Sequence, residues 1–336
     1  MIVLAAADKF KGTATAAQVC AAIGHACWEL GIDCIERPMA DGGEGTLDVL
    51  GGPNRTTKVT GPLGDPVDAQ WRFHKGVAII EMARASGLSL VGGAEKNDAI
   101  AATTQGTGEL IDTALDAGAK KIIVCVGGSA TTDGGLGAIR AIHAPARLKA
   151  VDFLVACDVE TTFVEAAEVF ASQKGASPRE VELLRKRLKR LQQMYDDNYG
   201  VDVGNLVGGG AAGGLAGGLA ALGATLINGF DLVAEEVGMY DLVKTVDLVI
   251  TGEGFIDEQS FEGKVVGSMC DLAHDANVPA MSICGDVADD LAEEFIRLAQ
   301  PHSLVQKFGE AEATTAPLQC IEQLAVQILR DYKYSA

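Results

Sequence analysis

The stretch MIVLAAADKFKGT at residues 1–13, together with the helical pattern that follows it, decides the fold class. Residues 2–7 form an apolar run of strand length, and the charged residues from Asp8 onward predict a loop. Apolar residues then recur with helical spacing over residues 14–30, where Thr13 can cap the start of the helix and Gly31 can end it. A second apolar run follows at once. This strand–helix–strand order predicts an α/β protein.

The same order recurs along the chain. The expected strands are residues 2–7, 34–39, 78–81, 121–126, 153–157, 247–251, 279–284 and 303–307. A helix is predicted to open at Ser177-Pro178-Arg179-Glu180, which has the spacing of a capping box with Pro at the first helical position. A last helix is expected over residues 317–332.

Composition excludes several classes of protein. The 336 residues include 27 Lys and Arg against 46 Asp and Glu, for a formal net charge of −19. Unless its basic residues are sharply segregated, a chain this acidic is repelled by nucleic acid and by anionic membrane surfaces, so we expect neither as a partner. The 48% hydrophobic and 22% charged content is typical of a packed globular protein, and the length suggests one large or two ordinary domains.

Cysteine usage and hydropathy bear on location. The eight Cys have no CxxC or Cys/His spacing, which predicts reduced core thiols and a cytoplasmic protein. The N-terminus lacks the basic start of a secretory signal. Residues 206–227 carry no charge, but eight of these 22 residues are Gly, so we interpret them as a buried loop and helix rather than a membrane span.

Five loops are rich in small residues, and four of them also carry carboxylates. The loops are residues 8–12, 40–46, 127–135, 208–214 and 251–257. In open α/β sheets ligands bind at the carboxyl ends of the strands, and Gly lets backbone N–H groups approach an anion closely. The carboxylates that follow strands or lie in these loops are Asp8, Asp41, Glu44, Asp133, Asp158, Glu253 and Asp257. Each can cap a helix, meet a cation or hold Mg²⁺.

Four lysines lie close to these glycines in the sequence and could bind a phosphate group: Lys9, Lys11, Lys174 and Lys264. No GxxxxGK[ST] motif is present, no GxGxxG follows the first strand, and no GxSxG occurs. A Walker-type site and Ser–His hydrolysis are therefore disfavoured. The residues by themselves predict an α/β enzyme that handles phosphate with Mg²⁺.

Ten blocks of sequence, in order, extend this prediction. They are DKFKGT (8–13), ADGGEGT (40–46), VTGPLG (59–64), EMARASGL (81–88), TQGTGELI (104–111), GGSATTDGG (127–135), ACDV (156–159), QKGAS (173–177), GGGAAGGL (208–215) and ITGEGFIDEQSFEGK (250–264). Together they resemble the bacterial glycerate kinase family of glycerate and glucarate catabolism.

The resemblance implies ATP-dependent phosphorylation of a hydroxyl of D-glycerate to give 2-phosphoglycerate, with ATP and Mg²⁺ as cofactors. It also implies two domains: a flavodoxin-like three-layer α/β domain built from residues 1–60 and 265–336, and an inserted mixed α/β domain of residues 61–264. The active site is then expected in the cleft between the two domains.

Roles for individual residues follow as hypotheses. For catalysis, we expect Asp41 or Asp8 to orient the glycerate hydroxyl and accept its proton, and Lys11 and Lys264 to offset charge on the γ-phosphoryl group. Lys9 or Arg84 would meet the glycerate carboxylate, beside a substrate loop of Gly42, Gly43 and Glu44. Backbone N–H groups would bind the nucleotide phosphates at Gly127, Gly128, Ser129, Gly208, Gly209, Gly210 and Gly213. The Mg²⁺ candidates are Asp133, Asp158 and Glu253.

The chain departs from the family pattern in places. Phe255 stands where Arg is common, the usual Asn-Pro-Leu after Asp158 is replaced by residues 160–163, and the segment at 143–152 is shorter. Phe cannot replace the bidentate donor that Arg supplies. Two alternatives therefore stay open: a kinase of the same fold acting on another small hydroxy acid, and a non-catalytic ligand-binding homologue.

Overall fold

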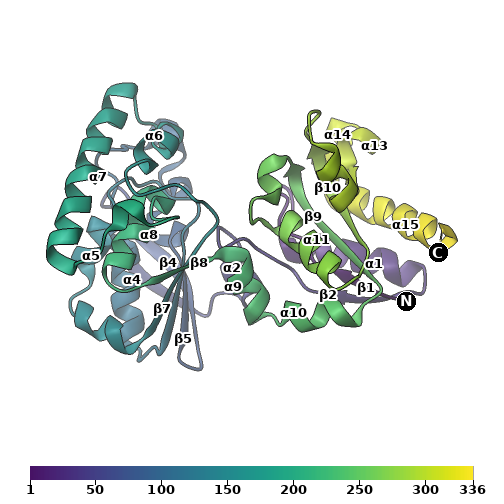
Figure 1. Ribbon diagram of the computed structural model, residues 1–336, viewed down its shortest axis with the longest axis horizontal. Coiled ribbons are helices and arrows are strands. Elements are labelled where there is room, and N and C mark those ends of the chain that lie inside the picture. The colour runs from purple at the N-terminus through teal and green to yellow at the C-terminus, as the bar shows by residue number, and fades with distance from the viewer. Residues whose placement is uncertain (336) are drawn as a thin grey trace. The chain divides into compact units, whose positions relative to one another are not determined.

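The computed structural model describes residues 1–335 and divides them into two compact units, shown in Figure 1. One unit joins the two chain ends, residues 1–41 and 230–336, and the other is the middle segment, residues 42–229. These boundaries differ from the expected ones at 60/61 and 264/265. The strand at residues 55–60 pairs within the middle sheet and therefore belongs to the middle unit rather than to the terminal one. The strand at residues 248–256 pairs within the terminal sheet and therefore belongs to the terminal unit rather than to the middle one.

The terminal unit is built on a parallel five-stranded sheet. Its strands are β1 (Ile2–Ala5), β2 (Asp33–Glu36), β9 (Leu248–Ile256), β10 (Ala280–Val287) and β11 (Pro301–Ser303). Their order is β11-β10-β9-β1-β2, with Val3 opposite Cys34 on one side and Leu248 on the other. Counted within the unit, this is the 2-1-3-4-5 order of flavodoxin-like folds. The flavodoxin-like α/β architecture is confirmed.

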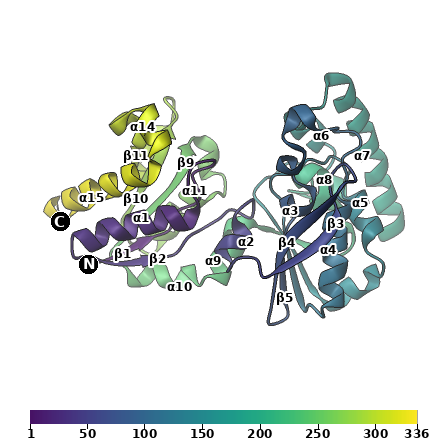
Figure 2. The same ribbon diagram turned by 180° about the vertical axis from the view of Figure 1, so that it is seen from behind.

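Helices cover both faces of the terminal sheet. They are α1 (Ala16–Glu29), α9 (Gly229–Glu236), α10 (Met239–Leu242), α11 (Val265–Asp275), α12 (Glu293–Ala299), α13 (Leu304–Phe308), α14 (Glu310–Thr315) and α15 (Pro317–Ser335). α1 and α15 share one apolar core with alternate residues of β1 and β9, such as Val3 and Ile250. α11 packs on β9 and β10 on the other face, so Figure 1 shows it in front of the sheet and Figure 2 shows α1 and α15 in front.

The middle unit is built on a six-stranded mixed sheet. Its strands are β3 (Arg55–Thr60), β4 (Pro66–His74), β5 (Val77–Glu81), β6 (Lys121–Cys125), β7 (Asp152–Cys157) and β8 (Thr225–Asn228), in sequential order. β3 and β4 are antiparallel to their neighbours, whereas β5 through β8 run parallel. The parallel strands therefore bring their carboxyl ends to one edge.

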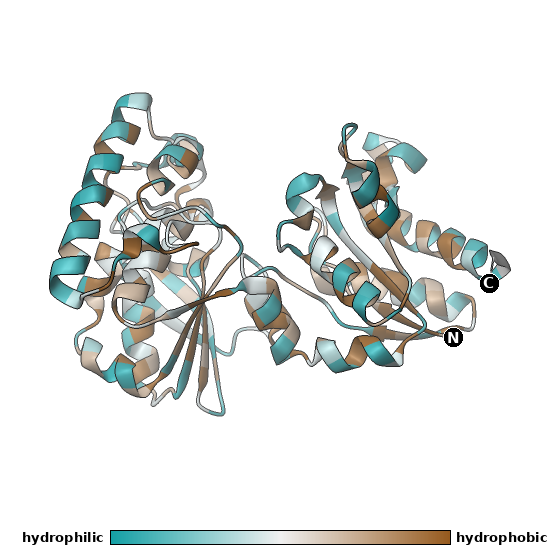
Figure 3. Cartoon of the chain, in the orientation of Figure 1, coloured by the Kyte–Doolittle hydropathy of each residue, from teal (hydrophilic) through white to brown (hydrophobic). Residues whose placement is uncertain are grey.

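Helices of the middle unit lie in two layers. They are α2 (Thr46–Val49), α3 (Ala83–Ser86), α4 (Gln105–Asp116), α5 (Leu136–Ala141), α6 (Ala166–Phe170), α7 (Pro178–Tyr199) and α8 (Ala211–Ala221). Residues of α4, α5 and α8 form one core with the sheet, while α6 and α7 belong to a second apolar cluster. In Figure 3 α7 is mostly hydrophilic, because only its stripe of Leu184, Leu188, Leu191 and Tyr195 is buried.

Local helix signals are largely confirmed. The predicted capping box of α7 is present between Ser177 and Glu180, and Gly31 follows the end of α1 with φ of 65°. The cap of α1 is Thr15 rather than Thr13, because the Thr15 hydroxyl accepts from Gln18 N at 3.2 Å. Residues 206–227 form a loop, α8 and β8, and no helix within residues 1–335 has the length and apolar content to span a membrane.

One predicted strand and one predicted loop need correction, and the sequence predicts no strand at β3 or β4. Residues 303–307 were expected to be a strand, but Ser303 ends β11 and its hydroxyl caps α13 by accepting from Gln306 N. The loop expected at 251–257 is largely the extension of β9, which pairs with β10 as far as Val287. β3 and β4 were missed because their outward residues are polar and exposed, so no apolar run marks them.

Candidate functional site

Carboxylates gather in the terminal unit where β1 and β9 lie side by side. Asp8 follows β1, and its backbone N donates to Gly252 O at 2.9 Å, next to Glu253 on β9. Asp41 follows β2 and is close enough to act electrostatically on both. β1 and β9 flank the topological switch point of a flavodoxin-like sheet, which is where such folds bind ligands.

Burial disfavours the negative charge of these carboxylates, and few nearby groups offset that cost. It raises the pKa of Asp8, which is 6% exposed, to about 7; Lys9 opposes the shift, while Asp41 and Glu253 add to it. Burial also raises the pKa of Glu253, against the lowering effect of Ser260 and Lys264. Glu253 Oε1 is buried without a hydrogen-bond partner. A buried oxygen of this kind favours an incoming cation.

Lysines of the terminal unit occupy different positions around this group. Lys9 Nζ lies 3.5 Å from Asp8 Oδ2, so it already serves as a counter-ion. Lys264 is the N-cap residue of α11 and lies near enough to Glu253 to lower its pKa. Lys11 is exposed. The terminal unit thus combines the predicted Asp8, Lys9, Asp41, Glu253 and Lys264 around one sheet edge.

The residues present fit Mg²⁺ only in part. Oxygen donors with uncompensated charge are what Mg²⁺ prefers, but within residues 1–335 no three His, Cys, Asp or Glu side chains come together as a metal-binding group. Mg²⁺ commonly keeps several waters and takes one or two carboxylates together with substrate phosphates. The arrangement therefore suits an ion carried by a phosphorylated ligand.

In the middle unit, two of the predicted loops pack against each other. A side chain at Gly127 would meet Gly43 Cα at 2.7 Å, and Gly128, with φ of 67°, lies against the carboxylate of Glu44. Only Gly can take this backbone conformation without strain while the loops stay so close. Gly42, Gly43 and Glu44 are thus brought together with Gly127 and Gly128 at the edge where the parallel strands end.

Lys174 contacts the 127–135 loop, which follows β6. Its Nζ donates to Ser129 Oγ and to Thr131 O, both at 2.7 Å. Burial lowers the pKa of Lys174 to about 7, although Asp133 acts in the opposite sense. The sequence places Lys174 beside a glycine but assigns it no role, because nothing local shows that it is buried against the 127–135 loop.

Asp133 occupies a structural position. Its carboxylate accepts hydrogen bonds from the backbone N of Thr104, Gly135 and Gly137 and from the Thr104 hydroxyl, at 2.9–3.1 Å. These contacts join the start of α4 to the start of α5 and use both carboxylate oxygens. This arrangement favours a helix-end anchor over a metal ligand for Asp133.

The glycine run at 208–214 also serves packing. The backbone N of Gly208, Gly209 and Gly210 donates to Glu160 O, Leu206 O and Thr161 O. At Gly213, with φ of 68°, a Cβ would overlap Thr131 O. Three of the four predicted nucleotide-binding glycines of this run therefore already use their N–H groups within the unit. Asp158 lies at the end of β7, in the segment that packs on Gly208.

Arg84 is engaged by its own unit. Its guanidinium donates to Glu81 Oε2, Gln70 Oε1 and Asp48 Oδ2 at 3.0–3.2 Å. Glu81 in turn accepts from the backbone N of Gly45 and Leu47. Arg84 therefore supports the 42–47 loop, and this leaves Lys9 as the better placed of the two predicted cations for a substrate carboxylate.

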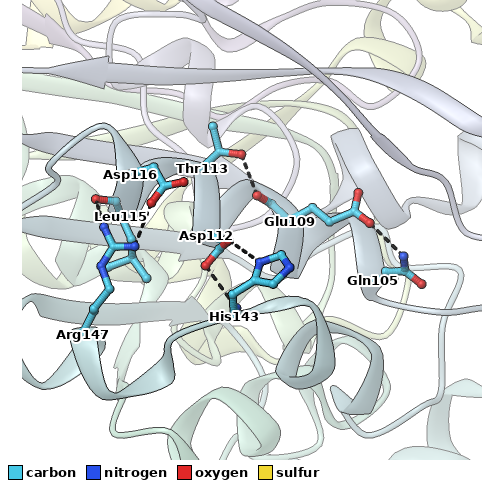
Figure 4. Close-up of polar contacts among 8 residues, drawn as sticks. All are labelled: Gln105, Glu109, Asp112, Thr113, Leu115, Asp116, His143 and Arg147. Carbon is cyan, nitrogen blue, oxygen red and sulfur yellow. Dashed lines mark hydrogen bonds and ion pairs between the residues drawn. The ribbon is translucent and has the colours of Figure 1, made fainter.

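A cavity of about 370 Å³ lies elsewhere on the middle unit, lined by Thr103, Gln105, Glu109, Gly137, Arg140, Ala141 and His143. Figure 4 shows Gln105 bonded to Glu109, and His143 bonded to Asp112. Burial raises the pKa of Glu109, but hydrogen bonds from Thr60 and Gln105 outweigh it and leave the pKa lowered. None of the predicted site residues lines this cavity.

The fold and the buried carboxylates at the switch point are typical of an α/β enzyme that acts on a small ligand. A family model described as the glycerate kinase family matches residues 3–145 and 139–333. The chain therefore belongs to the glycerate kinase family, and it is a kinase.

Individual proteins agree with this assignment. The chain is 37% identical to glycerate 2-kinase of Escherichia coli strain K12 over 331 residues, covering 87% of each chain. It is also 37% identical to glycerate kinase of Bacillus subtilis strain 168, covering 86% of each. A crystal structure of a protein assigned as glycerate kinase 2 from Salmonella typhimurium LT2 matches with a TM-score of 0.80 and 32% identity, over 100% of this chain and 99% of that one.

Proposed function

We propose that this chain transfers the γ-phosphoryl group of ATP to the 2-hydroxyl of D-glycerate and forms 2-phosphoglycerate. Its family and its similarity to named glycerate kinases support glycerate as the acceptor. The single observation that carries the proposal is the group of carboxylates at the switch point of the terminal sheet, where Asp8 is buried and Asp41 and Glu253 are half-buried. Phosphoryl transfer needs such groups to orient the acceptor and to organise cations.

Within this group, Asp8 suits the role of general base. Its pKa of about 7 matches the pH at which a kinase works, and a base poised near the operating pH accepts a proton most effectively. Asp41, the alternative base, would then orient the glycerate hydroxyl. Lys9 would meet the glycerate carboxylate, and Lys11 and Lys264 would offset charge on the γ-phosphoryl group. The position of the site between the two units stays a prediction.

Mg²⁺ would neutralise charge on the ATP phosphates. Glu253 is its best candidate ligand, because its Oε1 atom is buried and lacks a hydrogen-bond partner. Asp158 stays a candidate, whereas the hydrogen bonds of Asp133 exclude it from the set that we propose. For the nucleotide phosphates we favour Gly127, Gly128 and Ser129 over the Gly208–Gly210 amides, which are already bonded. We place the activity in the cytoplasm, since all eight Cys are free thiols.

A coupled assay of ADP release with D-glycerate, ATP and Mg²⁺ tests the proposal, with the phosphorylated carbon identified by ³¹P NMR. We expect turnover and a 2-phosphate product. Asp41→Asn and Lys11→Ala should each lower kcat at least about 100-fold, the usual scale for a lost catalytic group. Lys58→Ala, which removes an exposed lysine paired with Asp68, is the matched control and should leave kcat unchanged. Normal rates in both test variants would refute the assigned roles.

One observation favours an alternative substrate as the acceptor of the phosphoryl group. Phe255 is 52% exposed at the end of β9, two residues beyond Glu253, where the family pattern has Arg. A guanidinium lost at this point removes a donor for an anionic substrate. Another small hydroxy acid is therefore the alternative substrate. A panel of hydroxy acids under the same assay separates the two, since a better kcat/KM for any other acid would overturn D-glycerate.

A further inference from the structure

Lys174 is a buried ammonium with an unusual set of partners. It ends a short 3₁₀ turn, Ser172–Lys174, and is 7% exposed. Its Nζ donates to Ser129 Oγ and Thr131 O at 2.7 Å. Among the described residues, its hydrogen-bond partners include no carboxylate, and Asp133 acts on it only electrostatically. Burying a cation without a paired anion is costly, so its retention calls for a reason beyond packing.

Hydrogen-bond chemistry fixes the direction of the Ser129 bond. An anion bound nearby favours the protonated form of Lys174, and an ammonium group has hydrogens and no lone pair, so it can only donate. Ser129 Oγ must therefore accept from Lys174, and the hydrogen of the Ser129 hydroxyl has to point to another acceptor. A bond from a cation also polarises the hydroxyl and makes it a stronger donor. Lys174 thus turns Ser129 into an oriented donor in the 127–135 loop.

Neighbouring bonds hold both partners in place. Asn97 Nδ2 donates to Lys174 O at 2.8 Å and to Ala130 O at 2.9 Å, so one side chain joins the two segments. Leu88 N donates to Gly128 O, and Ala130 N donates to Ser86 O, on either side of Ser129. A donor fixed before its ligand arrives is what recognition of an anion requires.

We propose that Lys174 is a positioning residue that directs the Ser129 hydroxyl hydrogen toward a phosphate oxygen of the bound nucleotide. This inference rests on the proposed function and deepens it, because it assigns the phosphate contact of the 127–129 segment to a side-chain donor. The buried charge of Lys174 also favours an anion at that point, since no carboxylate of the described residues neutralises it at close range.

Calorimetric titration with Mg²⁺ and a non-hydrolysable ATP analogue tests the inference without glycerate. Ser129→Ala and Lys174→Met should each weaken analogue binding about tenfold, the scale of one charge-assisted hydrogen bond. The double variant should bind no more weakly than Lys174→Met alone, because both changes remove the same contact. Ser129→Thr keeps the hydroxyl and should retain most of the affinity. Kinetics should show a raised KM for ATP and an unchanged KM for glycerate.

Ser86→Ala is the matched control, since it removes another buried hydroxyl of this region, one bonded to Thr107, and should leave analogue affinity unchanged. Wild-type affinity in folded Ser129→Ala, or losses that multiply in the double variant, would overturn the inference. If Lys174→Met does not fold, the Ser129→Ala and Ser129→Thr pair decides, because Lys174 remains in both. The losses of analogue affinity in the double variant could be non-additive while the enzyme shows no turnover with glycerate. That result would refute glycerate as the acceptor but would support the role of Lys174.

Discussion

At the scale of single residues, burial brings a carboxyl group and an ammonium group toward the same pH. Burial raises the pKa of Asp8 to about 7 and lowers that of Lys174 to about 7, because in both cases it disfavours the charged form. Each change is moderated by one near charge, Lys9 for Asp8 and Asp133 for Lys174. Both groups can therefore respond to a charged ligand.

Asp133 is expected to contribute to stability. Asp133→Asn replaces one acceptor oxygen with an NH₂ group that faces backbone donors at the starts of α4 and α5. We expect the free energy of unfolding to fall by about 3 kcal/mol, measured by chemical denaturation. Asp152→Asn, at an exposed residue, is the control and should change little. Equal stability of the two variants would refute the anchoring role.

His143 should titrate above its usual range. The hydrogen bond and charge of Asp112 raise the pKa of this exposed imidazole. Because the folded pKa lies above the unfolded one, the contribution to stability is present below the usual pKa and is lost as pH rises through the raised value. NMR titration should show the raised pKa in the wild type and a return toward 6.5 in Asp112→Asn. An identical pKa in both would contradict the pairing.

At the scale of elements, the segment that opens α8 is shaped by close backbone contact. Gly213 has φ of 68° and lies against Thr131 O, whereas Gly223, just after α8, has φ of 100° and open space around it. Gly213 is thus required both by the backbone conformation and by close packing, whereas Gly223 is required only by the backbone conformation.

This difference predicts unequal costs for the same change. Gly223→Ala should lower the free energy of unfolding by about 1–2 kcal/mol through backbone strain alone. Gly213→Ala should cost at least about 3 kcal/mol, because its Cβ would also displace the 131–134 segment. Chemical denaturation of both variants measures the difference. Similar losses would show that packing at Gly213 adds nothing.

At the scale of the whole molecule, excess negative charge opposes folding. The net charge of −19 creates repulsion among surface carboxylates that salt can screen. The Debye length falls from about 10 Å at 0.1 M to about 3 Å at 1 M salt. We expect Tm to rise over this range with NaCl and also with choline chloride, which excludes specific cation binding as the cause. A Tm that falls in both salts would contradict this prediction.

Much of the fold could be predicted because its signals are local. The rhythm of strands and helices, the capping box at Ser177 and the end of α1 at Gly31 depend on residues within one or two turns of each other. The edge strand β3 and its neighbour β4 could not be found this way, since strands exposed to water carry polar residues. The division near residue 41 differs from the expected one, because it depends on which sheet each strand joins.

In the candidate site too, the sequence predicts the features that depend on local residues and not those that depend on distant ones. Residue types and their loops pointed to Asp8, Asp41 and Glu253, since carboxylates that follow apolar strands are visible in one dimension. The sequence could not show that Arg84 is bound by Asp48, Gln70 and Glu81. It also could not show that both oxygens of the Asp133 carboxylate already accept hydrogen bonds from backbone N–H groups. Burial and partners of a side chain arise from segments distant in the chain, such as Lys174 and Ser129, and only folding places those segments in contact.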